Sequence, residues 1–470
     1  MKVALVAPPW RGGNDYPPLG LAYLASSLEN AGYRQVRIFD LNLPGENVRD
    51  VAAFNPELVG ITSMTHVHSE ALETARKIRS LCGARIVMGG PHPTLFPGEV
   101  ASRDPVDFVI SGEGEIALVA LVQALSSGTD IKEVPGLTFR DGPRVVAAAD
   151  PAPIPELDAL PFPSRHLLKT GDYPLRTPEG EPIFTVLSSR GCPYNCAYCF
   201  KGLFGHRYRH RSPENILAEI RHLKETYDAR HFYFIDDVFM LQAERIQRIC
   251  ELILEHELDI RWQCLARVDR ATPEILRVMH AAGCRRIHYG IESGVQEILD
   301  GISKGITPEK VRDAVRWSQT AGIRCKGYFM TGLPGDTLET LEQTLRFARS
   351  LNLEEAMFSI TTPFPGTRLW DQVRERFGEE IASQGLHDAY YFCSNGGKPP
   401  LFFNLSNVDD ATLVNWTRRA NRIMMLDRNR RRYRRRFGAL GGAVIFHISR
   451  IDALRHLGER AHHFLRRAWA

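Results

Sequence analysis

The chain has 470 residues, which is long for a single domain and predicts two or three domains. Hydrophobic residues make up 44% and charged residues 24%, as in ordinary globular proteins. No apolar run is long enough for a membrane span or a secretory signal. We therefore expect a cytoplasmic protein whose nine cysteines are thiols or metal ligands, not disulfides.

The first 150 residues alternate short apolar runs with helical patterns. The runs KVALVAPP, QVRIFD, LVGITS, ARIVMGG and DFVISGEGE predict strands, and residues 19–31 and 69–81 predict helices between them. This alternation predicts an α/β, doubly wound, Rossmann-like domain over 1–150, with ligands at the carboxyl ends of its strands. The run GLTFRDGPRVVAAAD predicts a hairpin that turns at Asp141-Gly142, and the proline-rich segment 151–182 predicts a linker.

A second alternating series predicts a domain over 183–385. Its strands begin with FTVLSSRGC and continue with HFYFIDD, IRWQCLARVD, RRIHYGIESG, RCKGYFMTGLPGD and EEAMFSITTPFPGT. Six strand–helix units are fewer than the eight that close a barrel, so the pattern predicts a partial (β/α)6 TIM barrel. Residues 386–470 predict a loop followed by a helical, basic C-terminal segment.

Three cysteines stand close together after the first strand of this second series: Cys192, Cys196 and Cys199. Three thiolates on one loop can hold three corners of a cubane iron–sulfur cluster and leave the fourth iron open to a small molecule. Structural zinc is the alternative, and it would require a fourth ligand such as His206 or His210.

The stretch GCPYNCAYCF resembles the signature of the radical S-adenosylmethionine (SAM) superfamily, and the partial barrel matches that family's fold. The resemblance implies that the three cysteines ligate a 4Fe–4S cluster, that SAM chelates the fourth iron, and that reduction by flavodoxin or ferredoxin cleaves SAM to a 5′-deoxyadenosyl radical. It nominates as SAM-binding residues Tyr198, Phe200, Asp236, Asp237, Arg267, Glu292, Ser293, Phe329 and Met330. Of these, Phe329 and Met330 are implied to contact the adenine through the backbone near them. For Asp237 the alternative is a helix N-cap, and for Arg267 it is an ordinary ion pair with Asp269.

The first domain lacks a GxGxxG motif, which disfavours dinucleotide binding. Its segments YPPLGLAYLASSLENAGY, VGITSMTHVHSEA, VMGGPHPT and VISGEGE resemble, in order, the cobalamin-binding domain that precedes the barrel in one radical SAM subclass. The DxHxxG motif is absent, so the resemblance implies base-off cobalamin or a domain that has lost cobalamin. The residues implied to approach the corrin or its tail are Thr62, Ser63, Thr65, Gly89, Gly90, Pro91, His92 and Gly112.

The C-terminal segment is strongly basic. Residues 418–470 hold 15 Arg and three acids, a net charge of +12, so the remaining chain carries −8 of the total +4. This pattern is compatible with a solvated helix that caps the barrel, with peripheral contact to an anionic membrane surface, or, least favoured, with nucleic-acid binding.

Together these patterns predict a cobalamin-dependent radical SAM enzyme that methylates an unactivated carbon of a small-molecule or lipid substrate. Two alternatives remain open. One is a non-methylating outcome of the same chemistry, such as oxidative cyclisation or rearrangement. The other is a zinc-stabilised module that binds nucleic acid.

Overall fold

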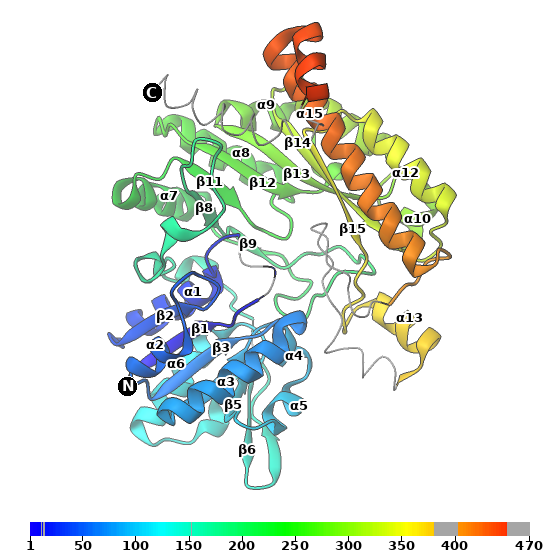
Figure 1. Ribbon diagram of the computed structural model, residues 1–470. Helices are drawn as coiled ribbons and strands as arrows, with labels where there is room; N and C mark the ends of the chain where they lie inside the picture. The colour runs from blue at the N-terminus through cyan, green and yellow to red at the C-terminus, as the bar shows by residue number, and fades with distance from the viewer. Residues whose placement is uncertain (11, 13–14, 152, 380–402, 449–470) are drawn as a thin grey trace.

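The computed structural model describes residues 1–10, 12, 15–151, 153–379 and 403–448. It contains two α/β units, each built on its own sheet, with the first unit below the second in Figure 1. A long C-terminal helix runs along the outer edge of the second unit. The predicted fold class is confirmed.

The first unit is a seven-stranded sheet in the order β2-β1-β3-β4-β5-β6-β7. The first five strands are parallel, and β6 and β7 form an antiparallel hairpin around Asp141 and Gly142, as predicted. Its strands are β1 (Val3–Ala7), β2 (Val36–Asp40), β3 (Leu58–Thr62), β4 (Arg85–Gly89), β5 (Phe108–Ile110), β6 (Leu137–Asp141) and β7 (Arg144–Ala147).

Helices cover both faces of this sheet, which explains why every residue of β1 is buried. One face packs against α1 (Leu19–Asn30) and α6 (Gly114–Ser127). The other packs against α2 (Val48–Ala53), α3 (His68–Cys82) and α5 (Pro97–Ser102), and the short α4 (Pro91–Leu95) follows β4. This is the doubly wound arrangement that alternating strand and helix patterns predict.

The predicted linker, 151–182, contains three short 3-10 turns: η3 (Leu157–Ala159), η4 (Arg165–Leu167) and η5 (Thr170–Asp172). It is packed against the second unit. The buried Arg165 forms an ion pair with Glu219 at 2.7 Å and donates a hydrogen bond of 2.7 Å to the carbonyl of Thr185. The segment therefore joins the two units through specific contacts.

The second unit is an open sheet of six parallel strands in the order β15-β14-β13-β12-β11-β8. The six strand–helix units expected of a partial barrel are present. Its strands are β8 (Ile183–Val186), β11 (His231–Phe234), β12 (Arg261–Ala266), β13 (Cys284–Glu292), β14 (Arg324–Thr331) and β15 (Glu355–Ile360). Its helices are α7 (Pro213–Tyr227), α8 (Ala243–Glu255), α9 (Pro273–Ala281), α10 (Gln296–Gly301), α11 (Pro308–Thr320), α12 (Leu338–Ser350) and α13 (Arg368–Phe377).

The C-terminal helix α15 (Asp410–Ile448) covers the open edge of this sheet at β15. The amide of Asn421 accepts a hydrogen bond from the backbone N–H of Phe358 (2.9 Å) and donates one to its carbonyl (2.8 Å). An unpaired strand edge exposes backbone groups that can pair with another chain, and the Asn421 amide satisfies the two backbone groups of Phe358. The helix is interrupted at Gly438, where φ is +73°. The part of the predicted basic segment beyond residue 448 lies outside the described residues.

Across the described chain, no helix has both the length and the apolar character needed to cross a membrane.

Candidate functional site

The three clustered cysteines lie on the loop between β9 (Ser189–Arg190) and β10 (Arg209–His210), directly after β8. The two short strands pair antiparallel and close the base of this loop. Gly191 follows β9 with φ of +82°, and a Cβ there would stand 2.3 Å from the carbonyl oxygen of Arg207. Only glycine fits this close approach. The residue that precedes Cys192 must therefore be glycine for the loop to keep this conformation.

The cysteines are free thiols; Cys192 is buried, and Cys196 and Cys199 are half-buried. Two cations stand beside them. The Nη1 atom of Arg267 lies 3.8 Å from the sulfur of Cys196. Burial opposes the charged form of Lys201, but the nearby Cys199 and Cys192 raise the pKa of Lys201 above its usual value. Burial raises the pKa of Cys199, and Lys201 acts against this by favouring the thiolate, which is the metal-ligating form.

Arg267 also adopts the predicted alternative. Its Nε donates to Asp269 at 2.9 Å, and its guanidinium lies over the ring of Tyr194 at 3.6 Å from the centroid. A third contact, from Nη2 to the carbonyl of Lys304 at 2.7 Å, fixes the side chain. Arg267 is therefore an ion-paired residue at the edge of the cysteine loop.

The structure separates the two neighbouring aspartates after β11. Asp236 is fully buried, and one of its oxygens accepts hydrogen bonds from the backbone and hydroxyl of Ser188 and from the hydroxyl of Ser189, at 2.5–2.9 Å. Burial raises the pKa of Asp236. The hydrogen-bonded oxygen holds the base of the cysteine loop, while the other is buried without a hydrogen-bond partner among the described residues, so a contact of Asp236 with SAM stays a prediction.

Asp237 is the exposed member of the pair. Its carboxylate accepts a hydrogen bond from the backbone N–H of Gly191, and it lies near Lys201 and Cys199. Although part of the Asp237 residue is exposed, its carboxyl group lies among the loop residues, and this burial raises the pKa of Asp237, while Lys201 acts in the opposite direction. Asp237 is therefore the aspartate that the fold brings to the thiols.

Glu292, at the carboxyl end of β13, forms a triad with Tyr198 and Lys304. Of the three, only Lys304 was not identified from the sequence. The Glu292 carboxylate accepts a hydrogen bond from the Tyr198 hydroxyl at 2.9 Å and pairs with Lys304 at 2.7 Å. Lys304 also donates to the Tyr198 hydroxyl at 2.9 Å. Burial, followed by the nearby Glu292 charge, raises the pKa of Tyr198 well above its usual range.

Lys304 stands in a loop without a recognisable motif, so no sequence signal identified it. Glu292 itself has a φ of +68°, a conformation that non-glycine residues rarely adopt. Such backbone strain is often found at functional sites. The triad therefore holds a strained carboxylate beside the tyrosine that precedes Cys199.

The remaining residues predicted to bind SAM have mixed placements. Ser293 is buried and bonds to the Thr344 hydroxyl at 3.1 Å. Phe329 is also buried, stacked on Phe358 with ring centroids 4.8 Å apart. Met330 packs with Tyr198 on the apolar cluster that includes Ala197 and Leu333. Only the backbone of Phe329 was predicted to contact the adenine, so its buried ring does not conflict with that prediction.

Phe200 lies where the two units meet. A Cβ added to Gly366, in the loop between β15 and α13, would lie 3.2 Å from the Phe200 ring and 2.8 Å from the side chain of Leu95 in α4. Gly366 has φ of +75°. Phe200 therefore links the cysteine loop, the last barrel strand and the first unit.

In the first unit, the predicted cobalamin-contacting residues cluster at the carboxyl ends of β3, β4 and β5. Gly90 has φ of +103°, and a Cβ there would lie 3.0 Å from the carbonyl oxygen of Ser63 and 3.1 Å from the hydroxyl of Thr62. Glycine thus lets two loops approach closely. The residues in these loops are Thr62, Ser63, Thr65, Gly89, Gly90, Pro91, His92 and Gly112.

The histidines of these loops differ in burial. The ring of His92 is fully buried and stacks on His68 with centroids 3.9 Å apart. His92 was implied to approach the corrin or its tail, and this role stays a prediction for a side chain that lies in the domain interior. His66 lies against Trp10, 5.1 Å between ring centroids, and burial lowers the pKa of His66 to about 4. This contact joins the loops after β1 and β3, where the strand order reverses and doubly wound sheets bind ligands.

Two acids of the SGEGE segment connect the first unit to the base of the cysteine loop. Glu113 accepts two hydrogen bonds from Arg209, one of them 2.9 Å long, and lies 3.4 Å from a nitrogen of Arg190. Glu115 accepts a hydrogen bond of 2.5 Å from Arg190. Glu113 also accepts one from the backbone N–H of Ile154 at 2.8 Å. We call these four charged residues the interdomain clamp.

The clamp was not found from the sequence. The SGEGE segment was interpreted as a ligand loop, whereas all four charged side chains are at most 7% exposed and neutralise one another. Arg190 and Arg209 are directly paired across β9 and β10. The clamp therefore fixes the base of the cysteine loop against the ligand-binding edge of the first sheet.

Polar side chains also gather inside the barrel. His288 on β13 lies 3.3 Å from the Tyr233 hydroxyl, 3.2 Å from the Tyr328 hydroxyl and 3.2 Å from the amide oxygen of Gln263. Burial, together with two neighbouring cations, lowers the pKa of His288 to about 3. The imidazole is therefore neutral near neutral pH. Sequence reasoning did not single out these four residues.

Comparisons with known proteins agree with this geometry. Residues 186–348 match the radical SAM superfamily, and residues 11–122 match the B12 binding domain. An uncharacterized methyltransferase of Pyrococcus horikoshii is 36% identical over 384 residues, which cover 79% of this chain and 83% of that protein. This chain belongs to the radical SAM superfamily. Its first domain places it among the members that also bind cobalamin.

This radical SAM enzyme is also similar to a cyclase and, in its fold, to a methyltransferase of known structure. The anaerobic magnesium-protoporphyrin IX monomethyl ester cyclase of Rubrivivax gelatinosus is 28% identical, over 80% of this chain and 70% of that protein. The structure of the radical SAM methyltransferase TsrM from Kitasatospora setae, with cobalamin and a [4Fe-4S] cluster bound, has a TM-score of 0.67 at 21% identity. It covers 80% of this chain and 76% of TsrM, and it supports the fold.

The residues present fit the cofactors of a cobalamin-dependent radical SAM enzyme: a 4Fe–4S cluster, SAM and cobalamin. The three free thiols share one loop, have cations beside them and stand at the carboxyl end of a barrel strand. Neither nearby histidine joins them as a zinc ligand would: His206 is exposed, and Nδ1 of His210 lies 3.2 Å from the carbonyl oxygen of Arg211. The match to the radical SAM superfamily over residues 186–348 includes this cysteine loop and favours an iron–sulfur cluster there. Zinc stabilisation is therefore not favoured.

Proposed function

We propose that this chain transfers a methyl group from SAM to an unactivated carbon of a small-molecule substrate. The interdomain clamp is the observation that carries the proposal. It holds the base of the cysteine loop against the edge of the first sheet where doubly wound domains bind ligands. Methyl transfer needs both centres near one substrate, and fixed positioning of reacting groups is a large part of catalysis.

When bound, the cluster and SAM would supply the radical that activates the carbon, and cobalamin would carry the methyl group. The chain's own residues would hold these groups in place. In this proposal Cys192, Cys196 and Cys199 ligate the cluster, and Asp237, beside the thiols, pairs with the SAM ammonium. Asp236 would act indirectly, by holding Ser188 and Ser189 at the base of the loop.

The Glu292 triad would form one wall of the SAM site. Tyr198 precedes Cys199, and its hydroxyl is fixed by both Glu292 and Lys304. This arrangement leaves the aromatic ring in a defined orientation next to the cluster loop. Met330 packs on the same apolar cluster as Tyr198, which supports the prediction that the end of β14 meets the adenosine.

The substrate would enter the barrel over the polar cluster around His288. A neutral imidazole with two tyrosine hydroxyls and an amide offers hydrogen bonds without a fixed charge. We propose that these groups orient a polar part of the substrate. A flavodoxin- or ferredoxin-type reductant would supply the electron.

We further propose that the substrate is a lipid and that the chain contacts a membrane surface peripherally. Both are supported by the charge of +12 over residues 418–470, since basic segments are attracted to anionic lipid surfaces. Oxidative cyclisation is the second candidate function, and the 28% identity to the anaerobic cyclase of Rubrivivax gelatinosus favours keeping it.

The test is anaerobic reconstitution of the full chain with iron, sulfide, cobalamin and SAM labelled in its methyl group. We expect label in the corrinoid and cleavage of SAM to 5′-deoxyadenosine under reduction, both abolished by Cys196→Ala. The matched control is Cys250→Ala, which removes a buried core thiol far from the loop in sequence. A chain that cleaves SAM but never labels cobalamin would favour cyclisation over methylation.

A further inference from the structure

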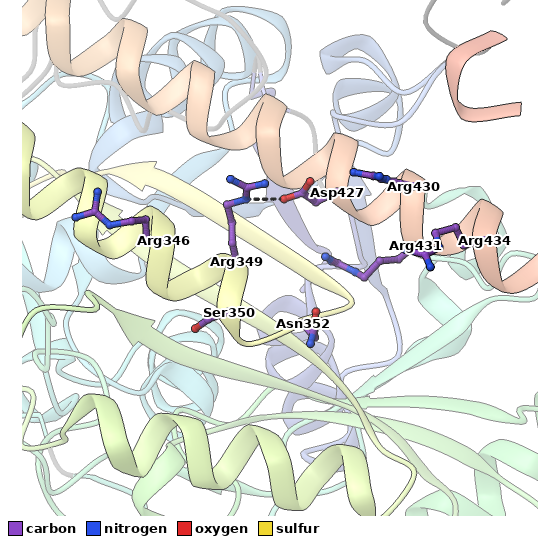
Figure 2. A pocket seen from close by; sticks show the side chains of 8 residues that line it. All are labelled: Arg346, Arg349, Ser350, Asn352, Asp427, Arg430, Arg431 and Arg434. Carbon is purple, nitrogen blue, oxygen red and sulfur yellow. Dashed lines mark hydrogen bonds and ion pairs between the residues drawn. The ribbon is translucent and has the colours of Figure 1, made fainter. Parts of the chain in front are cut away.

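A cleft lined with arginines lies on the outer face of the second unit, between α12 and α15. Its volume is about 550 Å³. Figure 2 shows side chains from both helices lining it. The lining residues are Arg346, Arg349, Ser350, Asn352, Asp427, Arg430, Arg431 and Arg434.

The cleft carries a large excess of positive charge. Five arginines line it against one carboxylate, Asp427, a net of +4. Asp427 is already paired with Arg349 at 2.8 Å, as Figure 2 shows. Arg431 donates a hydrogen bond of 2.7 Å to the carbonyl of Leu353, which anchors its guanidinium in the cleft. Burial and the nearby Arg435 lower the pKa of Arg431, although Asp427 acts in the opposite direction.

This arrangement differs from that of many other surface arginines in the protein. Exposed arginines elsewhere often pair with an acid one turn away, as Arg277 does with Glu274 and Arg312 with Glu309. Residues 428–436 contain seven arginines, and the one acid within a turn before them, Asp427, is paired with Arg349 of α12. Like charges crowded on one helix repel each other, so a solvated helix gains nothing from them. An anion between the two helices would relieve this repulsion.

We propose that the cleft between α12 and α15 binds a phosphate group. Guanidinium groups form paired hydrogen bonds to phosphate oxygens, and arginines from two helices can hold a phosphate from two sides. The inference does not depend on the radical chemistry. It rests on the membrane part of the proposed function only where the phosphate belongs to a lipid.

Exposed apolar side chains that follow the arginine run in the sequence favour a lipid headgroup as the source of the phosphate. Phe437 is 46% exposed, Leu440 85% and Val444 58%, and all three follow the arginine run on α15. Basic residues bound to headgroups, with apolar side chains beside them, are typical of helices that lie on membranes. A soluble phosphate ester would use the same arginines without these apolar residues.

The test compares two variants of the full, anaerobically purified chain. The cleft variant is Arg346→Gln with Arg430→Gln and Arg434→Gln. Its matched control changes three arginines of α15 that do not line the cleft, Arg422, Arg432 and Arg436, to Gln. Both variants lose three positive charges, so a difference between them reports the cleft and not the net charge.

Binding is measured with inorganic pyrophosphate by calorimetry, and with phosphatidylcholine vesicles, with and without phosphatidylglycerol, by flotation. We expect the cleft variant to bind at least roughly tenfold more weakly than the control in one arm, because it loses charge-assisted hydrogen bonds. A difference with pyrophosphate identifies a soluble phosphate, and a difference only with anionic vesicles identifies a lipid. A charge-conserving variant, Arg430→Lys with Arg434→Lys, should fall between the two.

Three results would overturn the proposal. The first is wild-type protein that binds neither probe. The second is equal binding by the cleft and control variants in both arms, since a diffuse basic surface would explain it. The third is tight binding of an RNA duplex that both triple variants weaken equally, while the two variants do not differ in binding to pyrophosphate or to vesicles.

Discussion

Glu113→Gln is the sharpest test of the interdomain clamp. The Glu113 side chain is 1% exposed and faces two buried guanidinium groups, Arg209 and Arg190. Glutamine keeps the shape but removes the charge, and its NH2 group would point a donor at other donors. Removing one partner of a buried ion pair costs about 3–5 kcal/mol, because the other charge stays buried without compensation.

We therefore expect Glu113→Gln to lower the free energy of unfolding by about 3–5 kcal/mol. The assay is urea-induced unfolding of the cofactor-free full chain, followed by circular dichroism. Iron and sulfide analysis after reconstitution reports separately whether the cysteine loop still holds its cluster. Because Arg190 directly precedes Gly191 and Cys192, we expect the reconstituted iron content to fall as well.

The matched control is Glu274→Gln, the same change at an exposed site whose partner Arg277 is also exposed. We expect no measurable change in that variant, since exposed ion pairs contribute little. If both variants unfold at the same urea concentration as the wild type, the interdomain clamp does not stabilise the contact between the two units, which contradicts this prediction.

Three further outcomes follow from the structure. Gly191→Ala should lose cluster iron while the fold is retained, because its Cβ would stand 2.3 Å from a carbonyl oxygen; iron analysis and circular dichroism check this. Lys304→Met should cost about 3 kcal/mol in urea unfolding and weaken SAM binding, because it leaves the buried Glu292 carboxylate without its cation. Burial opposes the charge of Glu355, yet ion pairs with Lys326 and Arg286 lower the pKa of Glu355 to about 2 from 4.5. The stabilising effect of the Glu355 carboxylate is therefore present above about pH 4.5 and lost as the pH falls toward 2. Glu355→Gln should lower the free energy of unfolding by about 2 kcal/mol at neutral pH and by progressively less in acid. Urea unfolding at several pH values measures this.

Each of these outcomes has a control. Gly98→Ala adds a methyl group where no atom lies within 4 Å, so it should keep its iron, and equal iron loss in both glycine variants would contradict the loop argument. Lys310→Met changes an exposed lysine of α11 and should leave SAM binding unchanged. A Glu355→Gln effect that stays constant between neutral and acid pH would show that the ion pairs do not shift this carboxyl group.

Local patterns determined much of this protein's organisation. Strand and helix periodicity predicted both sheets, and the helix predicted over 19–31 is α1, which begins at Leu19 and ends at Asn30. The spacing of Cys192, Cys196 and Cys199 predicted a shared loop after β8, and the three cysteines lie on that loop. These features are set within a few residues of each other, so a single sequence contains enough information to identify them.

Contacts between distant segments were decided by the tertiary structure. The sequence could not show whether Asp236 or Asp237 faces the thiols, because adjacent residues point in different directions and only the fold defines which side is buried. Glu113 meets Arg209 across 96 residues, and Tyr198 meets Lys304 across 106. Such pairs leave no local pattern, since each charge looks like an ordinary polar residue until the chain brings its partner to it.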